Sequence, residues 1–230
     1  MKNLFRMMRW DMVLLYRQGL VWVSLFIATL YGISLYYFKE VMPVEVVVLL
    51  IFSDPVMVGF IFIGAVTLLE KEANTFQALI VNPLKQWQYL WSKALCLTIV
   101  AFPITIVMVW AVGFSLQNMV LLLPGVGLTS VFFVFLGFAG AARVHTFNQY
   151  IIVIPIFLLP LCVPLVQLLG VYPGDWIFIV PTQASIELIR GAFVYLSSPI
   201  LLYSILYLLF STGMAYLYAR YSFEKYIIKR

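Results

Sequence analysis

The most evident shortage in this sequence is charge. Charged residues make up 10% of the 230-residue chain, whereas hydrophobic residues make up 64% and the mean hydropathy is +1.06. Soluble domains are about a quarter charged and about half apolar. The composition therefore excludes an ordinary soluble globular protein and indicates an integral membrane protein. Because the apolar runs are continuous and do not alternate with polar residues, they predict membrane-spanning helices and not a barrel.

Cysteine and histidine are also scarce. Cys96 and Cys162 both lie within apolar runs, which predicts small buried side chains and no disulfide framework or metal site. The single histidine, His145, lies in a short polar turn, and we assign it no role. An enzyme needs clustered polar residues on facing helices, and the apolar runs offer almost none beyond Asp54. We therefore expect no catalytic site, no metal and no cofactor held by this chain.

Six apolar runs are long enough to cross a bilayer, and together they predict an all-α transmembrane domain covering residues 1–230. The first run is of span length and lacks a small-residue cleavage site, so we expect a span and not a cleaved leader. Three prolines, at 155, 160 and 164, predict that the fifth span is bent or locally unwound. The expected spans are Leu20–Phe38, Val46–Leu69, Ala94–Leu116, Met119–Ala142, Gln149–Leu169 and Ile200–Ala219.

Residues 1–19 predict an amphipathic helix that lies in the membrane interface. Apolar residues fill much of the helix surface, and Asp11 projects roughly opposite Lys2. The Asp11 carboxylate is either solvated or in contact with a partner protein, and the sequence leaves both open. The basic residues share one helical face: Lys2, Arg6, Arg9 and Arg17.

Residues 176–196, before the last span, predict a re-entrant or interfacial helix pair on the outer side. The run Trp176–Val180 is too short to cross a membrane, and Pro181 opens a weakly amphipathic segment. Glu187 and Arg190 are three residues apart and can pair on one face of that segment.

The longest polar interruption, residues 70–84, predicts a short amphipathic helix outside the membrane. Asn74 and Gln77 have the spacing of a capping pair, and Pro83 ends the helix at the preceding residue. The alternative is a surface helix that simply joins two spans. The apolar face of the helix comprises Phe76, Leu79 and Ile80.

A second polar interruption, Ser53-Asp54-Pro55, lies inside the second apolar run. A carboxylate at membrane depth is costly and usually faces a cavity, water or a partner, and a proline beside it kinks the helix. The alternative is that the span begins near Pro55 and that Asp54 lies at its outer mouth. Both readings stay open at this stage.

Basic residues are distributed unequally between the two sides of the predicted spans. The pI of 9.2 reflects residues that flank spans, so the membrane explains them better than a nucleic acid does. With both termini in the cytoplasm, the outer segments hold only Lys39 and Arg190, which also puts residues 70–84 on the cytoplasmic side of a bacterial plasma membrane. The inner segments hold the rest: Lys2, Arg6, Arg9, Arg17, Lys71, Lys85, Lys93, Arg143, Arg220, Lys225, Lys229 and Arg230.

The inner helix carries the pattern E-x-E-x-x-T-x-x-A-L-x-x-x-P-L…Y-x-x-x-K, which resembles the permease subunits of second-type ABC exporters. The segment around Ser53-Asp54-Pro55 is most similar to permeases of the fluoroquinolone-export type, and the resemblance covers essentially the whole chain. Two positions depart from the family: Asn74 stands where glycine is common, and Asn82 where threonine is common. Asparagine tolerates the left-handed conformation of glycine and caps helices as threonine does. The pattern is formed by Glu70, Glu72, Thr75, Ala78, Leu79, Pro83, Leu84, Tyr89 and Lys93.

The resemblance implies a permease without its own motor. The sequence holds no G-x-x-x-x-G-K-[ST], so ATP and Mg would be bound by a separate ATPase subunit. Residues 70–84 would be the coupling helix that docks in the ATPase, with the N-terminal helix against the same surface. The residues implied in that contact are Glu70, Glu72, Asn74, Thr75, Phe76, Leu79, Asn82, Pro83, Arg6, Arg9 and Asp11.

The resemblance also implies a path for cargo between two permease copies, whether identical or paralogous. The cargo would be a hydrophobic or amphipathic drug-like molecule. Alternatives are another cargo on the same fold (a lipid, haem, a polysaccharide or a bacteriocin) or a membrane scaffold that transports nothing. Each path residue has lipid contact or core packing as its simpler reading. The candidates are Trp22, Phe26, Tyr31, Asp54 and Met57.

Overall fold

The computed structural model describes residues 2–38, 40–76, 85–113, 119–170 and 175–228. Within these ranges five helical stretches are long and apolar enough to cross a membrane, so the predicted all-α fold with several apolar spans is confirmed. The elements that form them are α2 (Leu20–Phe38), α3 (Val44–Val56), the π-helical η1 (Met57–Phe62), α4 (Ile63–Glu72), α6 (Gln86–Val112), α7 (Met119–Ala141), α11 (Ser198–Phe223) and the π-helical η3 (Glu224–Ile228). The others are α1 (Lys2–Arg17), α8 (Phe147–Cys162), α9 (Pro164–Leu168), the 3₁₀ turn η2 (Asp175–Ile179) and α10 (Pro181–Arg190).

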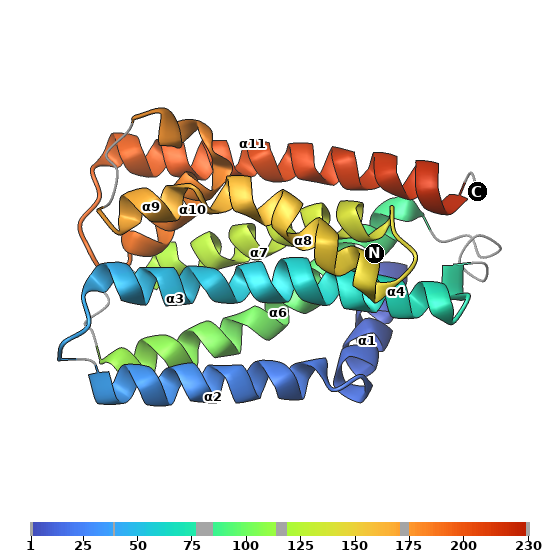
Figure 1. Cartoon of the computed structure of the whole chain (residues 1–230), viewed down its shortest axis with the longest axis horizontal. Coiled ribbons are helices and arrows are strands. Elements are labelled where there is room, and N and C mark those ends of the chain that lie inside the picture. The colour runs from blue at the N-terminus through green and yellow to red at the C-terminus, as the bar shows by residue number, and fades with distance from the viewer. Residues whose placement is uncertain (1, 39, 77–84, 114–118, 171–174, 229–230) are drawn as a thin grey trace.

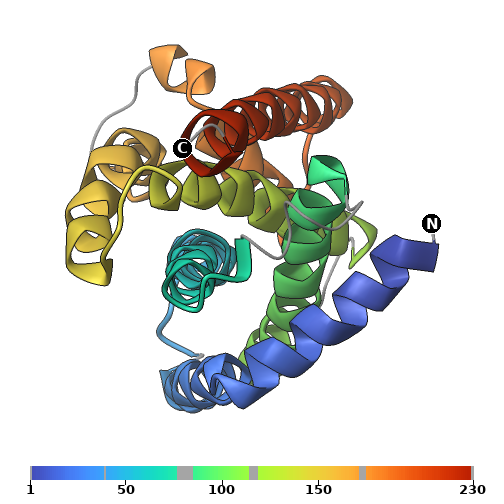
Figure 2. The same ribbon diagram turned by 90° about the vertical axis from the view of Figure 1, so that its right-hand side faces the viewer.

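The long helices run side by side, and the ends of the chain lie at the same end of the bundle (Figure 1). The stretch formed by α3, η1 and α4 occupies the centre, where 71% of its most apolar window is buried. By contrast, only 22% of the corresponding window of α2 is buried, and α2 lies at the edge (Figures 1 and 2). The apolar outer side of α2 is therefore available to lipid or to another chain.

The second span stays helical through its polar interruption. Asp54 and Pro55 both lie within α3, and the helix changes to π-helical geometry immediately afterwards, in η1. Proline removes one backbone hydrogen bond from a helix, and wider turns accommodate such defects. The span starts at Val44, so Asp54 lies ten residues inside it, about 15 Å along the axis at 1.5 Å per residue. This position favours the buried reading of Asp54 over the outer-mouth reading.

The predicted fifth span has a different form. It consists of α8 and the short α9, separated at Val163, and α8 alone is shorter than the five stretches above. Pro155 and Pro160 lie inside α8 and Pro164 begins α9, while Val163 at the interruption keeps right-handed helical dihedrals, with φ −54° and ψ −39°. The bend or local unwinding expected from the prolines therefore stays a prediction. Thr182 donates a hydrogen bond to the carbonyl oxygen of Leu161 near this break, at 2.5 Å.

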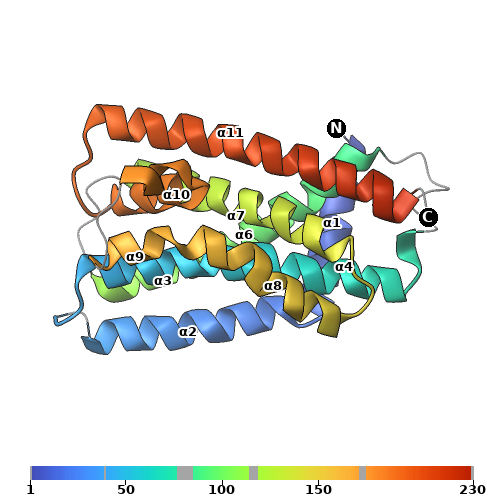
Figure 3. The ribbon, with the colours of Figure 1, turned by 45° about the horizontal axis from the view of Figure 1, so that its top comes forward.

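The segment before the last span holds η2 and α10, so two short helical elements are present where a pair was predicted. However, every residue from Thr182 to Ile189 is buried, and α10 packs against α11, α7 and α3. Figure 3 shows α10 between α11 and the rest of the bundle. The burial of α10 argues against the interfacial alternative, and the re-entrant alternative stays a prediction.

The N-terminal helix α1 lies across the end of the bundle and meets α2 at a sharp turn (Figure 2). Gly19 makes this turn with φ +78°, a conformation that other residues rarely adopt. The helix is amphipathic as predicted: Arg6 and Arg9 are exposed, whereas Leu15 is buried in the core. The turn at Gly19 lets α1 pack against the first half of α6.

Candidate functional site

A buried charge cluster fastens three helices together at the end of the bundle where the two termini lie. Its centre is Lys93, whose ammonium group pairs with Asp11 Oδ1 at 2.6 Å and also with Glu70 Oε1. All three residues are less than 9% exposed. An isolated buried charge is costly, but a buried charge with good partners is tolerated.

Two hydroxyl groups complete the cluster. Tyr89 donates a hydrogen bond to Glu70 Oε2 at 2.6 Å, and Ser92 donates one to Asp11 Oδ2. With the two bonds from Lys93, each of the four carboxylate oxygens has a donor. The cluster is thus a fully satisfied polar network, which fixes the geometry of the groups in it.

The spacing of the residues on α6 explains how one helix supplies three donors. Tyr89, Ser92 and Lys93 lie at i, i+3 and i+4, so their side chains share one face of the helix. Asp11 comes from the middle of α1 and Glu70 from the end of α4. The network therefore ties the N-terminal helix and the end of the second span to the start of the third.

An aromatic layer lies directly beside the charge cluster. The ring of Phe76 is 5.7 Å from that of Tyr89 and 6.2 Å from that of Phe223, and Phe138 stacks on Phe223 at 5.8 Å. Only 8% of Phe76 is exposed. Phe76 therefore packs within this chain, and its side chain is not exposed for contact with an ATPase.

Lys71 joins the end of the second span to α7 at the same end of the bundle. Its ammonium group donates hydrogen bonds of 2.8–2.9 Å to three carbonyl oxygens at the end of α7, those of Ala141, Ala142 and Val144. A cation is favourable there because the last carbonyl groups of a helix lack partners within the helix. The end of the second span is thereby joined to α7 as well as to α6.

The chain leaves the second span through an exposed turn. Glu72, Ala73, Asn74 and Thr75 are all exposed, and Asn74 has φ +54°. The capping pair of Asn74 with Gln77 stays a prediction, because Gln77 lies outside the described residues. Asn74 ends α4 in the left-handed conformation that was expected to suit an asparagine in place of glycine.

The residues predicted to contact an ATPase fall into three groups. Asp11, Glu70 and Phe76 are buried and have partners within the chain, which replaces the reading of Asp11 as a solvated or partner-bound carboxylate. Glu70 and Glu72 also belong to α4 and not to a separate helix 70–84. The exposed members are Arg6, Arg9, Glu72, Asn74 and Thr75, and the members outside the described residues are Leu79, Asn82 and Pro83.

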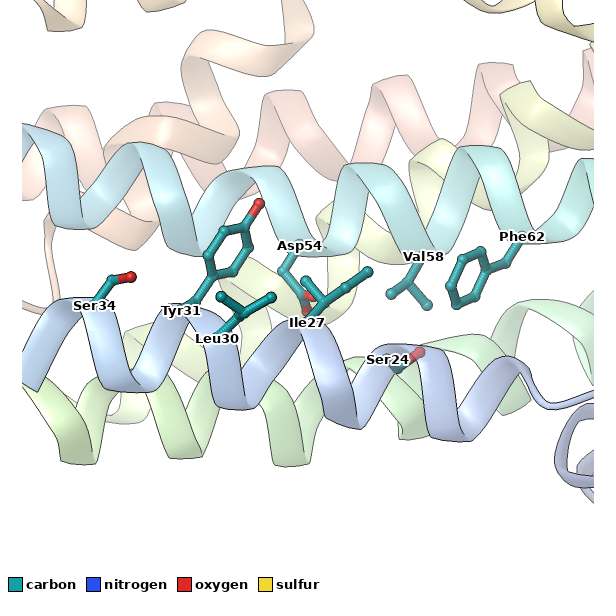
Figure 4. Close-up of a pocket in the computed structure, with 8 residues that line it drawn as sticks. All are labelled: Ser24, Ile27, Leu30, Tyr31, Ser34, Asp54, Val58 and Phe62. Carbon is teal, nitrogen blue, oxygen red and sulfur yellow. The ribbon is translucent and has the colours of Figure 1, made fainter.

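A second site is a cavity of about 290 Å³ between α2 and the central span (Figure 4). Asp54 points into the space between the helices, and 3% of the residue is exposed. Its Oδ2 atom is buried and has no hydrogen-bond partner among the described residues. The residues lining the cavity are Ser24, Ile27, Leu30, Tyr31, Ser34, Asp54, Val58 and Phe62.

Only some of the predicted cargo-path residues line this cavity. Tyr31 and Asp54 line the cavity, whereas Trp22 and Phe26 are 57% and 67% exposed and do not line it. The backbone of Met57 begins η1, and its side chain is outside the described part of the structure. Among the described residues, no three His, Cys, Asp or Glu side chains gather as a metal site.

Sequence reasoning missed the central member of the charge cluster. Lys93 and Tyr89 both occur in the same pattern as Glu70, yet the sequence analysis gave neither a partner within the chain. Their spacing with Ser92, at i, i+3 and i+4 on one helix face, was the available signal.

Comparison with known proteins finds relatives over most of the chain. The model of the fluoroquinolones export permease protein family matches residues 2–230. Two curated relatives, both fluoroquinolones export permease proteins of Mycobacterium tuberculosis (strains CDC 1551 / Oshkosh and ATCC 25618 / H37Rv), are each 25% identical to the chain over 182 residues. Each match covers 77% of this chain and 76% of the relative.

Proposed function

Because the chain belongs to the fluoroquinolones export permease protein family, we propose that it is the transmembrane subunit of an ATP-driven ABC exporter. The observation that carries the proposal is the fully paired cluster around Lys93, which lies next to an exposed turn at one end of the bundle. The subunit is not an enzyme by itself. A separate ATPase subunit binds ATP and Mg, since this sequence has no nucleotide-binding loop.

Force enters the permease at the exposed turn 72–75 and at the basic face of α1. Arg6, Arg9, Glu72 and Thr75 form the polar contact with the ATPase. Movement of the turn reaches α4 directly. The cluster of Lys93 with Asp11 and Glu70 then passes the movement to α1 and α6 as one unit.

The same end of the bundle is proposed to face the cytoplasm of a bacterial plasma membrane. Lys71, Lys85, Arg143 and Arg220 lie near this end together with α1, whereas Arg190 lies near the other. Cytoplasmic segments carry the excess of lysine and arginine. In this arrangement α8 and α9 complete a sixth crossing, and both termini are cytoplasmic.

A second permease copy is proposed to cover the outer side of α2. Trp22 and Phe26 are exposed there on an apolar helix that this chain leaves largely uncovered. Cargo passes between the two copies, which are identical or close paralogues. The relatives are named for fluoroquinolones, so the proposed cargo is a drug-like amphipathic molecule and the activity is multidrug efflux.

The ATPase contact is tested by reversing one exposed charge. Glu72→Lys should reduce the ATPase activity that co-purifies with the tagged permease from native membranes, whereas Glu40→Lys should not. Both glutamates are exposed, and they lie at opposite ends of the bundle. The co-purified subunit is identified by mass spectrometry and must contain a nucleotide-binding loop. If the Glu72→Lys and Glu40→Lys variants recovered equal ATPase activity, the turn 72–75 would not be the ATPase contact.

A further inference from the structure

We propose that the cavity between α2 and the central span binds amphipathic organic cations, with the Asp54 carboxylate as the counter-ion of a protonated amine. The proposal deepens the proposed function, on which it rests, by naming the chemical class of the cargo and the residues that select it. Binding itself requires no ATPase and is measured on the permease alone.

The first support is that a buried carboxylate oxygen of Asp54 lacks a hydrogen-bond donor among the described residues. No described residue donates a hydrogen bond to the buried Asp54 Oδ2, and burial of an unpaired polar atom is costly. The described residues offer no neutralising charge, because the ion pairs among them involve Lys93 and Arg220 and none includes Asp54. An ammonium group in the cavity supplies both a donor and a positive charge.

The second support is the pattern of side chains that face each other across the cavity. On the central span, Asp54, Val58 and Phe62 recur every four residues, which puts one acidic group at the head of an apolar stripe. Figure 4 shows this stripe opposite the side chains of α2. A ligand with a charged head and an apolar body therefore matches the wall that carries Asp54.

The third support comes from α2, which closes the other side. Ile27 and Leu30 are apolar, and Tyr31 adds an aromatic ring, whose face attracts cations. Ser24 already donates its hydroxyl hydrogen to the carbonyl oxygen of Leu20 at 2.9 Å, so its oxygen remains as an acceptor. An acceptor-rich cavity without a basic side chain favours a cation over an anion.

The size of the cavity sets a limit on the ligand. Its volume of about 290 Å³ is at the low end of the roughly 300–1,000 Å³ typical of ligand pockets. It accommodates an amine attached to one fused aromatic ring system, and a larger molecule would extend along the apolar outer side of α2.

The test uses three probes with the same ring and different charge: 1-naphthylmethylamine, 1-naphthylmethanol and 1-naphthoic acid. Each is titrated into the full-length permease in lipid nanodiscs, and binding is followed by calorimetry. We expect the amine to bind at least about tenfold more tightly than the alcohol, as a charge-assisted hydrogen bond predicts, and the acid to bind most weakly. Equal affinity for the amine and the alcohol, or a preference for the acid, would overturn the proposal.

Variants separate the role of the charge from the integrity of the cavity. Asp54→Asn should abolish the preference for the amine while keeping the affinity for the alcohol, and Asp54→Glu should retain the preference. Glu45→Gln is the matched control, since Glu45 is also on α3 but does not line the cavity, and it should behave as the unmodified protein. Retention of the amine preference in Asp54→Asn contradicts the proposal. Amine binding with no ATPase partner found would instead contradict the proposed exporter function and leave this site in place.

Discussion

The charge cluster and the cavity present two buried acidic sites with opposite arrangements. At the end of the bundle, the four carboxylate oxygens of Asp11 and Glu70 each accept a hydrogen bond. Within the central span, the carboxylate of Asp54 is equally buried, and its Oδ2 atom has no partner in the part of the chain that the structure describes. A buried acid whose oxygens all accept hydrogen bonds therefore joins helices, whereas a buried acid with an unpaired oxygen can bind a ligand.

The largest expected effect comes from removing the cation at the centre of the cluster. Lys93→Met leaves two carboxylates facing each other in a buried site, and the loss of one partner of a buried ion pair costs about 3–5 kcal/mol. We expect a marked fall in the free energy of unfolding of the purified protein in detergent. The control is Lys85→Met, because Lys85 is exposed at the start of the same helix. Unfolding at the same denaturant concentration for both variants would show that the cluster does not stabilise the fold.

A direct comparison of the two acidic sites uses the same substitution in each. Asp11→Asn loses charge-assisted bonds to Lys93 and Ser92, so we expect a stability loss of about 1.5–3 kcal/mol. Asp54→Asn removes no hydrogen bond from Oδ2 to another described residue, and its stability should change by less than about 1 kcal/mol. Denaturant unfolding of both variants checks this difference. A loss at Asp54 as large as that at Asp11 would mean that Asp54 is also a structural acid.

A neutral buried hydroxyl provides an intermediate case. Tyr150 donates a hydrogen bond to the carbonyl oxygen of Phe60 at 2.6 Å, within the π-helical turn η1 that forms part of the cavity wall. Tyr150→Phe should destabilise the protein by about 1 kcal/mol. Thermal unfolding is compared with that of Tyr195→Phe, since Tyr195 is exposed and should give no change. If Tyr150→Phe lowered the stability as much as Lys93→Met does, the charged network would not stabilise the fold more than the neutral hydrogen bond.

The smallest structural effect is expected from a probe of orientation. Thr75 is exposed beside the charge cluster and Glu40 is exposed at the other end of the bundle, so Thr75→Cys and Glu40→Cys should leave stability unchanged. In a background with Cys96→Ala and Cys162→Ser, a membrane-impermeant maleimide should label position 40 in intact cells and position 75 only in inside-out vesicles. Labelling of position 75 in intact cells would invert the proposed orientation.

Several local features followed from the sequence because their causes are local. The prolines at 155, 160 and 164 predict a bend or local unwinding of the segment that holds α8 and α9, since proline removes backbone hydrogen bonds wherever it stands. The left-handed conformation of Asn74 was also anticipated from the tolerance of asparagine for positive φ. By contrast, the capping pair of Asn74 with Gln77 stays a prediction, because Gln77 lies outside the described residues.

Contacts between distant parts of the chain were not accessible in the same way. Asp11 lies 82 residues before Lys93, and neither residue stands in a local pattern that names the other as its partner. Phe76 was placed on the apolar face of a short helix outside the membrane, as a contact for an ATPase, yet it packs against Phe223 of α11. Hydropathy describes the average surroundings of a segment and not the neighbours of one side chain.

The sequence by itself determined that this protein is helical and membrane-embedded, and its motifs pointed to an export permease. These properties follow from composition, run length and short patterns, each of which is complete within a stretch of chain. Only the tertiary structure decided which acidic residues are paired, because the partners of Asp11 and Glu70 are brought to them by the packing of α1, α4 and α6. The same packing leaves Asp54 facing α2 across a cavity, and so separates the acid that fastens the bundle from the acid that is free to bind.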